Sequence, residues 1–142
     1  MSLPTLLLLV GLPRSGKSTF AAKHGAPVVC PDSVRLALHG QRHCPSAEPM
    51  VWVVARIMVK ALFLSGHQTV ILDATNTRKE WRDQWRSPDW DIVVHVEPTD
   101  AEECKRRAVA TGQEDLVPVI DRMAAQLLEP ENIADLRRYS WV

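Results

Sequence analysis

The chain has 142 residues, 46% of them hydrophobic and 24% charged, a composition typical of a globular domain and not of a disordered or fibrous one. Its 17 basic and 17 acidic side chains give a formal net charge of zero, which argues against a broad positive surface along a long nucleic acid. The length predicts one domain that spans residues 1–142.

Cysteine usage and apolar runs predict the compartment. The three cysteines form an odd set without C-x-x-C spacing, which argues against a disulfide framework or a zinc site and favours a reducing cytoplasm. No basic segment precedes the apolar run at 6–10, and Arg56 and Lys60 interrupt the run at 50–64. Neither run predicts a signal peptide or a membrane span. We therefore expect a cytoplasmic protein without a membrane partner.

Apolar runs and turn residues predict strands that alternate with helices along the chain. The expected strands are residues 6–10, 27–30, 68–72 and 91–97, with the tail at 138–142 offering a fifth. The expected helices are residues 18–24, 32–38, 48–65, 77–86, 101–110 and 117–128. Thr77 and Glu80 have capping-box spacing at the start of the fourth helix. This alternation predicts an α/β fold, with a mostly parallel sheet of four or five strands flanked by helices.

Residues 11–18 read Gly-Leu-Pro-Arg-Ser-Gly-Lys-Ser, the complete G-x-x-x-x-G-K-[ST] pattern of a phosphate-binding P-loop. The two glycines let successive N–H groups point at phosphate oxygens, and the helix that follows adds partial positive charge. Lys17 is expected to reach the β- and γ-phosphates of ATP or another NTP, and the Ser18 hydroxyl to bind Mg²⁺. The expected nucleotide-binding residues are Gly11, Pro13, Arg14, Ser15, Gly16, Lys17, Ser18 and Thr19.

Acidic side chains follow two of the other expected strands. Because ligands bind at the carboxyl ends of parallel strands, residues 11–18, Asp32 and residues 73–76 are expected to face one cleft. Asp73 ends the third strand, where P-loop enzymes place an acid near Mg²⁺, and we assign it to the metal with Ser18. The alternative is an Asx-turn that leads into the next helix.

Asp32 and Arg35 are three residues apart and can share one face of a helical turn. A kinase needs a carboxylate that accepts the proton of the acceptor hydroxyl, and a guanidinium that binds phosphate. The alternative assigns Asp32 to a helix cap and Arg35 to a solvated surface. A basic cluster at 105–107 precedes Thr111 and Gly112, and could close over a nucleotide as a lid or pair with nearby glutamates.

Together these motifs resemble the kinase domain of the polynucleotide 5′-hydroxyl kinase family. The similarity runs through residues 11–21, 32–35, 73–76, 102–107 and 117–123. It implies that Lys17 and Ser18 hold the phosphates and Mg²⁺, and that Asp32 is the general base. It also implies that Arg35 contacts the acceptor or the transferring phosphate, and that Arg107 contacts the donor phosphates from the lid. This chain departs from the family pattern at Ala74, where some relatives carry the acid that here stands one residue earlier at Asp73, and at Thr111, where a second basic residue often stands.

Three functions follow as hypotheses. The leading one is an ATP-dependent kinase that phosphorylates a 5′-hydroxyl end of DNA or RNA in nucleic acid repair. The second is a P-loop kinase of a small-molecule hydroxyl, such as a nucleoside, sugar nucleotide or antibiotic, which the neutral charge balance favours. The third is a non-catalytic nucleotide-binding module, against which the presence of both Asp32 and Arg35 argues.

Overall fold

All strands of the protein run parallel in a single sheet, as the computed structural model shows for residues 2–42, 44–138 and 140–141. Their spatial order is β2-β3-β1-β4-β5, so the strand that leads into the P-loop is central. The strands are β1 (Thr5–Val10), β2 (Val28–Val29), β3 (Thr69–Leu72), β4 (Asp91–Val96) and β5 (Ser140–Trp141). In register, Leu8 of β1 lies beside Leu72 of β3 and Val94 of β4. The strands therefore end together at the edge where the P-loop begins.

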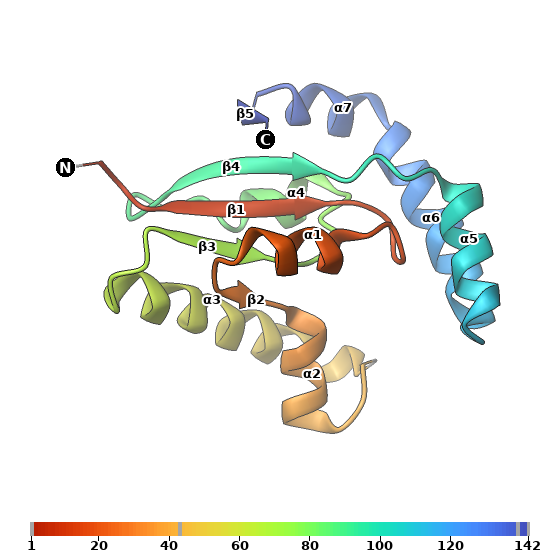
Figure 1. The fold of residues 1–142 in the computed structure, drawn as a ribbon, viewed down its shortest axis with the longest axis horizontal. Helices are drawn as coiled ribbons and strands as arrows, with labels where there is room; N and C mark the ends of the chain where they lie inside the picture. Colours follow the sequence, from red (N-terminus) through yellow and green to blue (C-terminus); the bar gives the residue numbers. More distant parts are fainter. Residues whose placement is uncertain (1, 43, 139, 142) are drawn as a thin grey trace.

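Helices cover both faces of this sheet and its carboxyl edge (Figure 1). The helices are α1 (Lys17–His24), α2 (Pro31–His39), α3 (Glu48–Leu64), α4 (Lys79–Asp83), α5 (Ala101–Ala110), α6 (Val117–Leu128) and α7 (Pro130–Leu136), and short 3₁₀ turns cover Pro45–Ala47 and Glu114–Leu116. In Figure 1 the strand arrowheads point toward α5 and α6, which lie side by side at that end. The α/β fold with a parallel sheet flanked by helices is confirmed.

Alternate residues of β1 contribute to two separate clusters of buried residues. Leu6, Leu8 and Val10 pack with α3, Trp85 and Trp90 on one face, whereas Leu7 and Leu9 pack with α1 on the other. A third cluster joins Leu12 of the P-loop to Cys104, Ala108 and Ile120 of α5 and α6. Helices α5 and α6 are thus anchored on the P-loop itself.

The fourth predicted helix is wrong in its start, its length and its cap. The structure forms α4 only over Lys79–Asp83. The Thr77 hydroxyl donates to Oε1 of Gln126 at 2.7 Å instead of capping the helix. The first backbone N–H of α4 donates to Oδ1 of Asn132 at 2.7 Å, so the cap comes from α7. A local pattern cannot predict such a contact, because its partner lies 53 residues away.

Helix α7 was not predicted, and the second strand is shorter than expected. α7 begins at Pro130, a residue that suits the first helical position. It buries Asn132 and Asp135, polar residues that pattern analysis assigns to a surface. β2 covers only Val28–Val29 of the expected 27–30. The expected fifth strand forms over Ser140–Trp141, and the rest of its predicted range beyond Arg138 lies outside the described residues.

Across the described parts of the chain, no helix is both long and apolar enough to cross a membrane.

Candidate functional site

The P-loop forms a tight cradle whose glycines are needed for space and for backbone geometry. A Cβ on Gly11 would lie 2.8 Å from Oγ of Ser15 and 3.1 Å from Cβ of Glu97, so no larger residue fits there. Gly16 has φ +105°, a conformation that glycine adopts without strain. Lys17, 8% exposed, folds over the loop and donates from Nζ to the Leu12 carbonyl at 2.9 Å. These features are those of a phosphate-binding loop.

Ser15 adds a polar group that points into this cradle. The residue is 2% exposed, and among the described residues its hydroxyl has no hydrogen-bond partner. Its carbonyl is fixed from outside by Oγ1 of Thr99, which donates at 2.7 Å. An unpaired buried hydroxyl is costly, and a phosphate oxygen in the cradle would satisfy it. The loop therefore fits the phosphates of a nucleotide.

Ser18 and Asp73 meet at the carboxyl edge, as the parallel-strand rule predicts. The Ser18 hydroxyl donates to Oδ2 of Asp73 at 2.8 Å. Asp73 is 8% exposed and directly follows β3. A hydroxyl and a carboxylate at this separation are two hard oxygen ligands, and Mg²⁺ typically binds one or two protein oxygens together with substrate phosphates. The pair therefore fits a Mg²⁺–nucleotide complex.

The segment after β3 is bound to the P-loop through its backbone as well. The Gly11 N–H donates to the Thr75 carbonyl at 3.0 Å. Asn76 adopts φ +47° and donates from Nδ2 to the Leu9 carbonyl at 2.9 Å. Its own carbonyl accepts from Nη1 of the buried Arg82 at 2.8 Å. The loop that carries Asp73 is therefore fixed at several points, and its geometry depends on Arg82.

Burial lowers the pKa of Lys17. Desolvation lowers the pKa of the Lys17 ammonium, while the nearby Asp73 carboxylate and, more weakly, Asp32 oppose the shift. Because phosphates stabilise an ammonium as Asp73 does, a bound nucleotide would raise this pKa again.

On α2, Asp32 and Arg35 lie on one face of the first turn, as their spacing suggested, and form an ion pair. Nη1 of Arg35 lies 2.7 Å from Oδ1 of Asp32, and their side chains are 15% and 59% exposed. Arg35 also binds Glu48 with two nitrogens, Nε to Oε2 at 3.0 Å and Nη2 to Oε1. Its guanidinium stands over the Trp52 ring, 5.7 Å from the centroid. Glu48, at the start of α3, was missed by the sequence analysis, and no local motif signals its contact with Arg35.

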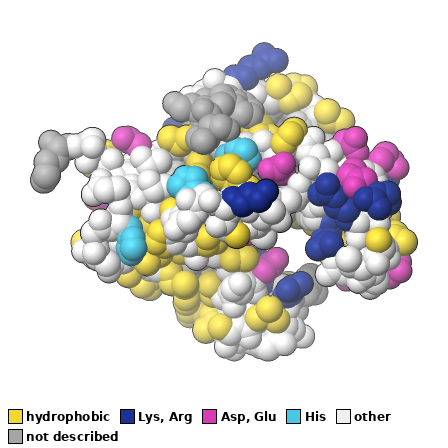
Figure 2. Space-filling view, in the orientation of Figure 1, with side chains coloured by type: hydrophobic (Ala, Val, Ile, Leu, Met, Phe, Trp, Pro, Cys, Tyr) yellow, Lys and Arg dark blue, Asp and Glu magenta, His cyan; other side chains and the backbone are white. Residues whose placement is uncertain are grey.

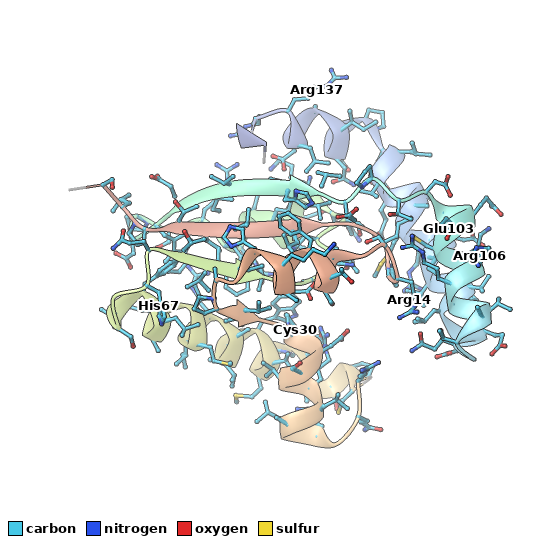
Figure 3. The ribbon with its side chains drawn as sticks, in the orientation of Figure 1. Arg14, Cys30, His67, Glu103, Arg106 and Arg137 are labelled. Carbon is cyan, nitrogen blue, oxygen red and sulfur yellow. The ribbon has the colours of Figure 1, made fainter. Side chains whose placement is uncertain are left out.

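Arg107 faces the P-loop and Arg106 does not contact it. Nη1 of Arg107 donates to the Arg14 carbonyl at 3.1 Å, which joins α5 to the apex of the loop. Glu103 binds both arginines, with Oε1 3.1 Å from Nε of Arg107 and 2.6 Å from Nη2 of Arg106. The hydrogen bond from Arg106, and to a smaller extent that from Arg107, lowers the pKa of the Glu103 carboxyl to about 2. Figure 3 shows Arg14, Glu103 and Arg106 together where the P-loop meets α5.

Glu97 and Thr99 are further residues that the sequence analysis missed. Both follow β4. Glu97 lies against Gly11, and its Oε2 lies 3.2 Å from Nε2 of His95. The His95 ring stacks on Phe20 of α1, with centroids 3.7 Å apart. The fourth strand therefore supports the P-loop from the side opposite Asp73, which its position next to β1 could have suggested.

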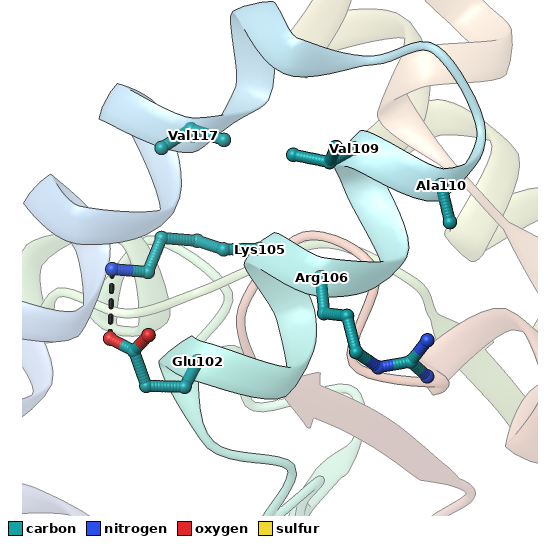
Figure 4. Close-up of a pocket in the computed structure, with 6 residues that line it drawn as sticks. All are labelled: Glu102, Lys105, Arg106, Val109, Ala110 and Val117. Carbon is teal, nitrogen blue, oxygen red and sulfur yellow. Dashed lines mark ion pairs between the residues drawn. The ribbon is translucent and has the colours of Figure 1, made fainter.

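A shallow cavity between α5 and α6 lies away from this site (Figure 4). It has a volume of about 570 Å³ and is lined by Glu102, Lys105, Arg106, Val109, Ala110 and Val117. None of these residues belongs to the P-loop or to α2. Figure 2 instead shows a hollow between the part of the molecule that carries α2 and the end formed by α5 and α6, with Lys and Arg side chains on the α5–α6 side.

Comparisons with known proteins agree with this geometry. A family model described as an AAA domain matches residues 6–130. A chain solved as part of the Pnkp1/Rnl/Hen1 RNA repair complex is 26% identical with a TM-score of 0.74, covering 89% of this chain and 45% of that one. A second structure of a Pnkp1/Rnl/Hen1 complex is 32% identical with a TM-score of 0.67, covering 75% of this chain and 40% of that one. This chain thus spans less than half the length of either.

More distant similarity shows the fold alone. A gluconokinase from Sinorhizobium meliloti is 17% identical with a TM-score of 0.57, covering 100% of this chain and 83% of that one. No curated protein matches the sequence significantly. The resemblance suggested by the motifs is confirmed at the level of a P-loop kinase domain similar to chains of an RNA repair complex. The chain belongs to the AAA domain family, and its fold is that of a P-loop kinase.

Proposed function

We propose that the protein is an ATP-dependent kinase that phosphorylates the 5′-hydroxyl end of a DNA or RNA strand. The observation that carries this proposal is the pairing of two sets of residues at one edge of the sheet. Lys17, Ser18 and Asp73 suit a nucleotide, and the Asp32–Arg35 pair on α2 suits an acceptor hydroxyl.

In the proposed reaction the acceptor oxygen attacks the γ-phosphorus, and the bond from that phosphorus to the β–γ bridging oxygen breaks. Asp32 accepts the hydroxyl proton, while Arg35 binds the acceptor or the transferring group. Lys17 exchanges the Leu12 carbonyl for phosphate oxygens. Mg²⁺, held by Ser18 and Asp73, would neutralise charge on the phosphates. Arg107 approaches the donor from the lid, where it already contacts the Arg14 carbonyl.

The shape of the acceptor side favours a polynucleotide end over a small molecule. Sites for small molecules enclose most of the ligand surface, whereas the side chain of Asp32 is 59% exposed. The hollow next to the part of the molecule that carries α2 is open in Figure 2. An open site admits one end of a long strand. The similarity to chains of an RNA repair complex supports the same choice.

The second candidate is a kinase of a small-molecule hydroxyl. The zero net charge favours it, because a polyanionic acceptor gains little from the field of the whole protein. The similarity in fold to a gluconokinase is compatible with it. The two candidates share the donor site and differ only in the acceptor.

Phosphate transfer from γ-labelled ATP to a panel of acceptors tests the proposal. The panel holds single- and double-stranded 5′-hydroxyl oligonucleotides of DNA and RNA, nucleosides, and small sugars. We expect label on oligonucleotides, and a loss of about 10²-fold or more in rate for Asp32→Asn, the size of a general-base contribution. The neighbouring exposed Ser33→Ala is the matched control and should keep full activity. Label on small alcohols alone would favour the second candidate.

A further inference from the structure

Arg14 has an unusual backbone conformation for its residue type. It lies in the P-loop with φ +67°, in the left-handed region that glycine favours. A glycine there would form the same turn without strain. Residues held in such conformations concentrate at functional sites, where the surrounding structure fixes them. The arginine side chain is therefore the feature of this position that needs an explanation.

The Arg14 guanidinium is also unpaired, in contrast to the other arginines of the site. Arg35 binds Asp32 and Glu48, and Arg106 and Arg107 both bind Glu103. Arg14 is exposed, and no acidic side chain of the described residues pairs with it. Its positive charge is thus available to a ligand.

The position of Arg14 separates it from the donor phosphates. Ser15 and Lys17 are 2% and 8% exposed inside the cradle, whereas Arg14 is exposed at the apex of the loop. Its carbonyl is held by Arg107 at 3.1 Å, so the apex is fixed against the lid. Figure 3 shows Arg14 at this junction, and Figure 2 shows Lys and Arg side chains along the lid side of the hollow. The side chain therefore meets a ligand that lies outside the cradle.

We propose that Arg14 binds a backbone phosphate of the acceptor strand, and that it makes the site select acceptors with phosphodiester groups over uncharged alcohols. This inference rests on the proposed function, since it concerns the acceptor of that same site. A guanidinium suits a phosphodiester because it donates two parallel hydrogen bonds to two oxygens. Arg35 is held beside Asp32 and is assigned to the reacting end of the acceptor, so a backbone phosphate farther along the strand needs a second cation.

The test measures binding of a fluorescent 5′-hydroxyl oligonucleotide by anisotropy over a series of salt concentrations, without any need for catalysis. Arg14→Gly removes the side chain and suits the left-handed backbone, so the fold should be retained. We expect about tenfold weaker binding, the weight of one hydrogen bond to a charged group. The slope of log affinity against log salt should fall by about 0.7, the value for one phosphate of a single strand. ATP affinity is measured in parallel, because the sequence pattern places Arg14 in the nucleotide-binding loop, and it should fall much less than oligonucleotide affinity.

Two variants complete the design. Arg14→Lys keeps the charge and should keep most of the salt slope. Lys23→Ala, in the last turn of α1, removes the same charge from another exposed position and should leave both slope and affinity unchanged. An unchanged salt slope in Arg14→Gly would overturn the inference, as would an equal loss of ATP affinity, which would assign Arg14 to the donor. Failure of the proposed function has another signature, in which the wild type binds no oligonucleotide or transfers no phosphate to it.

Discussion

Breaking the buried Arg82–Asp135 pair should cost the protein a large part of its stability. Both side chains are 0% exposed, with Nη2 of Arg82 3.0 Å from Oδ2 of Asp135. Asp135→Asn keeps the size of the side chain and removes its charge. The Arg82 charge then stays buried without its partner, and losses of this kind amount to about 3–5 kcal/mol.

This cost is a large fraction of the free energy of unfolding of a typical domain, which is about 5–15 kcal/mol. At about 4 °C per kcal/mol, the unfolding midpoint should fall by roughly 12–20 °C. Urea unfolding, followed by tryptophan fluorescence and by circular dichroism, measures the loss in the free energy of unfolding. An unaltered m-value would place the effect in the folded state. Trp85, which is 1% exposed, supplies a buried reporter near the pair.

Glu80→Gln is the matched control for this measurement. It also removes one carboxylate from an arginine pair, but Arg78 and Glu80 are 43% and 60% exposed. Its unfolding midpoint should equal that of the wild type, since solvent screens an exposed pair. A loss below about 1 kcal/mol for Asp135→Asn would mean that the buried pair contributes little, because water or another acceptor would then be satisfying Arg82. Since Arg82 also holds the Asn76 carbonyl, the variant should bind Mg²⁺ more weakly in activity assays at temperatures where it stays folded.

Three further predictions concern the donor site and the lid. Binding of ATP at alkaline pH should be accompanied by proton uptake, because burial lowers the pKa of Lys17 and the bound phosphates raise it again. Titration calorimetry in two buffers with different ionisation enthalpies measures this uptake. It should be absent in Lys17→Met. Because the pKa of Glu103 is lowered from 4.5 to about 2, its ion pairs stabilise the folded state at pH values above 4.5. This stabilisation is lost as the pH falls toward 2. Wild type should therefore unfold at a higher temperature than Glu103→Gln at pH 6, with the difference vanishing near pH 2, and a constant difference would contradict this. Arg107→Ala should lower kcat more than ATP affinity, whereas Arg106→Ala should change neither. Single-turnover rates and ATP-binding measurements compare the two variants. A larger loss of kcat in Arg106→Ala would shift the lid assignment by one residue.

The features that the sequence predicted well are local in the chain or follow from sheet topology. The apolar run of β1 and the glycine pattern of residues 11–18 define the cradle within one short segment. The meeting of Ser18 with Asp73 follows from the parallel arrangement of β1 and β3. Neither inference needs information about distant side chains.

The features that the sequence did not predict depend on long-range polar contacts. Helix α7 places Asn132 and Asp135 in the interior, where they bind the backbone of Lys79 and the side chain of Arg82. Glu48 meets Arg35 only because α3 packs beside α2. Hydrophobic periodicity has no signal for such contacts, since a buried polar residue and a solvated one look the same in a sequence.

A matched pair of acceptors can show whether the protein transfers the γ-phosphate of ATP to a 5′-hydroxyl. One oligonucleotide carries a 5′-hydroxyl, and the other has the same sequence with a 5′-phosphate that blocks this position. With γ-labelled ATP and Mg²⁺, the wild type should label only the first, and Lys17→Ala should label neither while keeping the wild-type circular dichroism. Equal labelling of both oligonucleotides, or full labelling by a folded Lys17→Ala protein, would contradict the account.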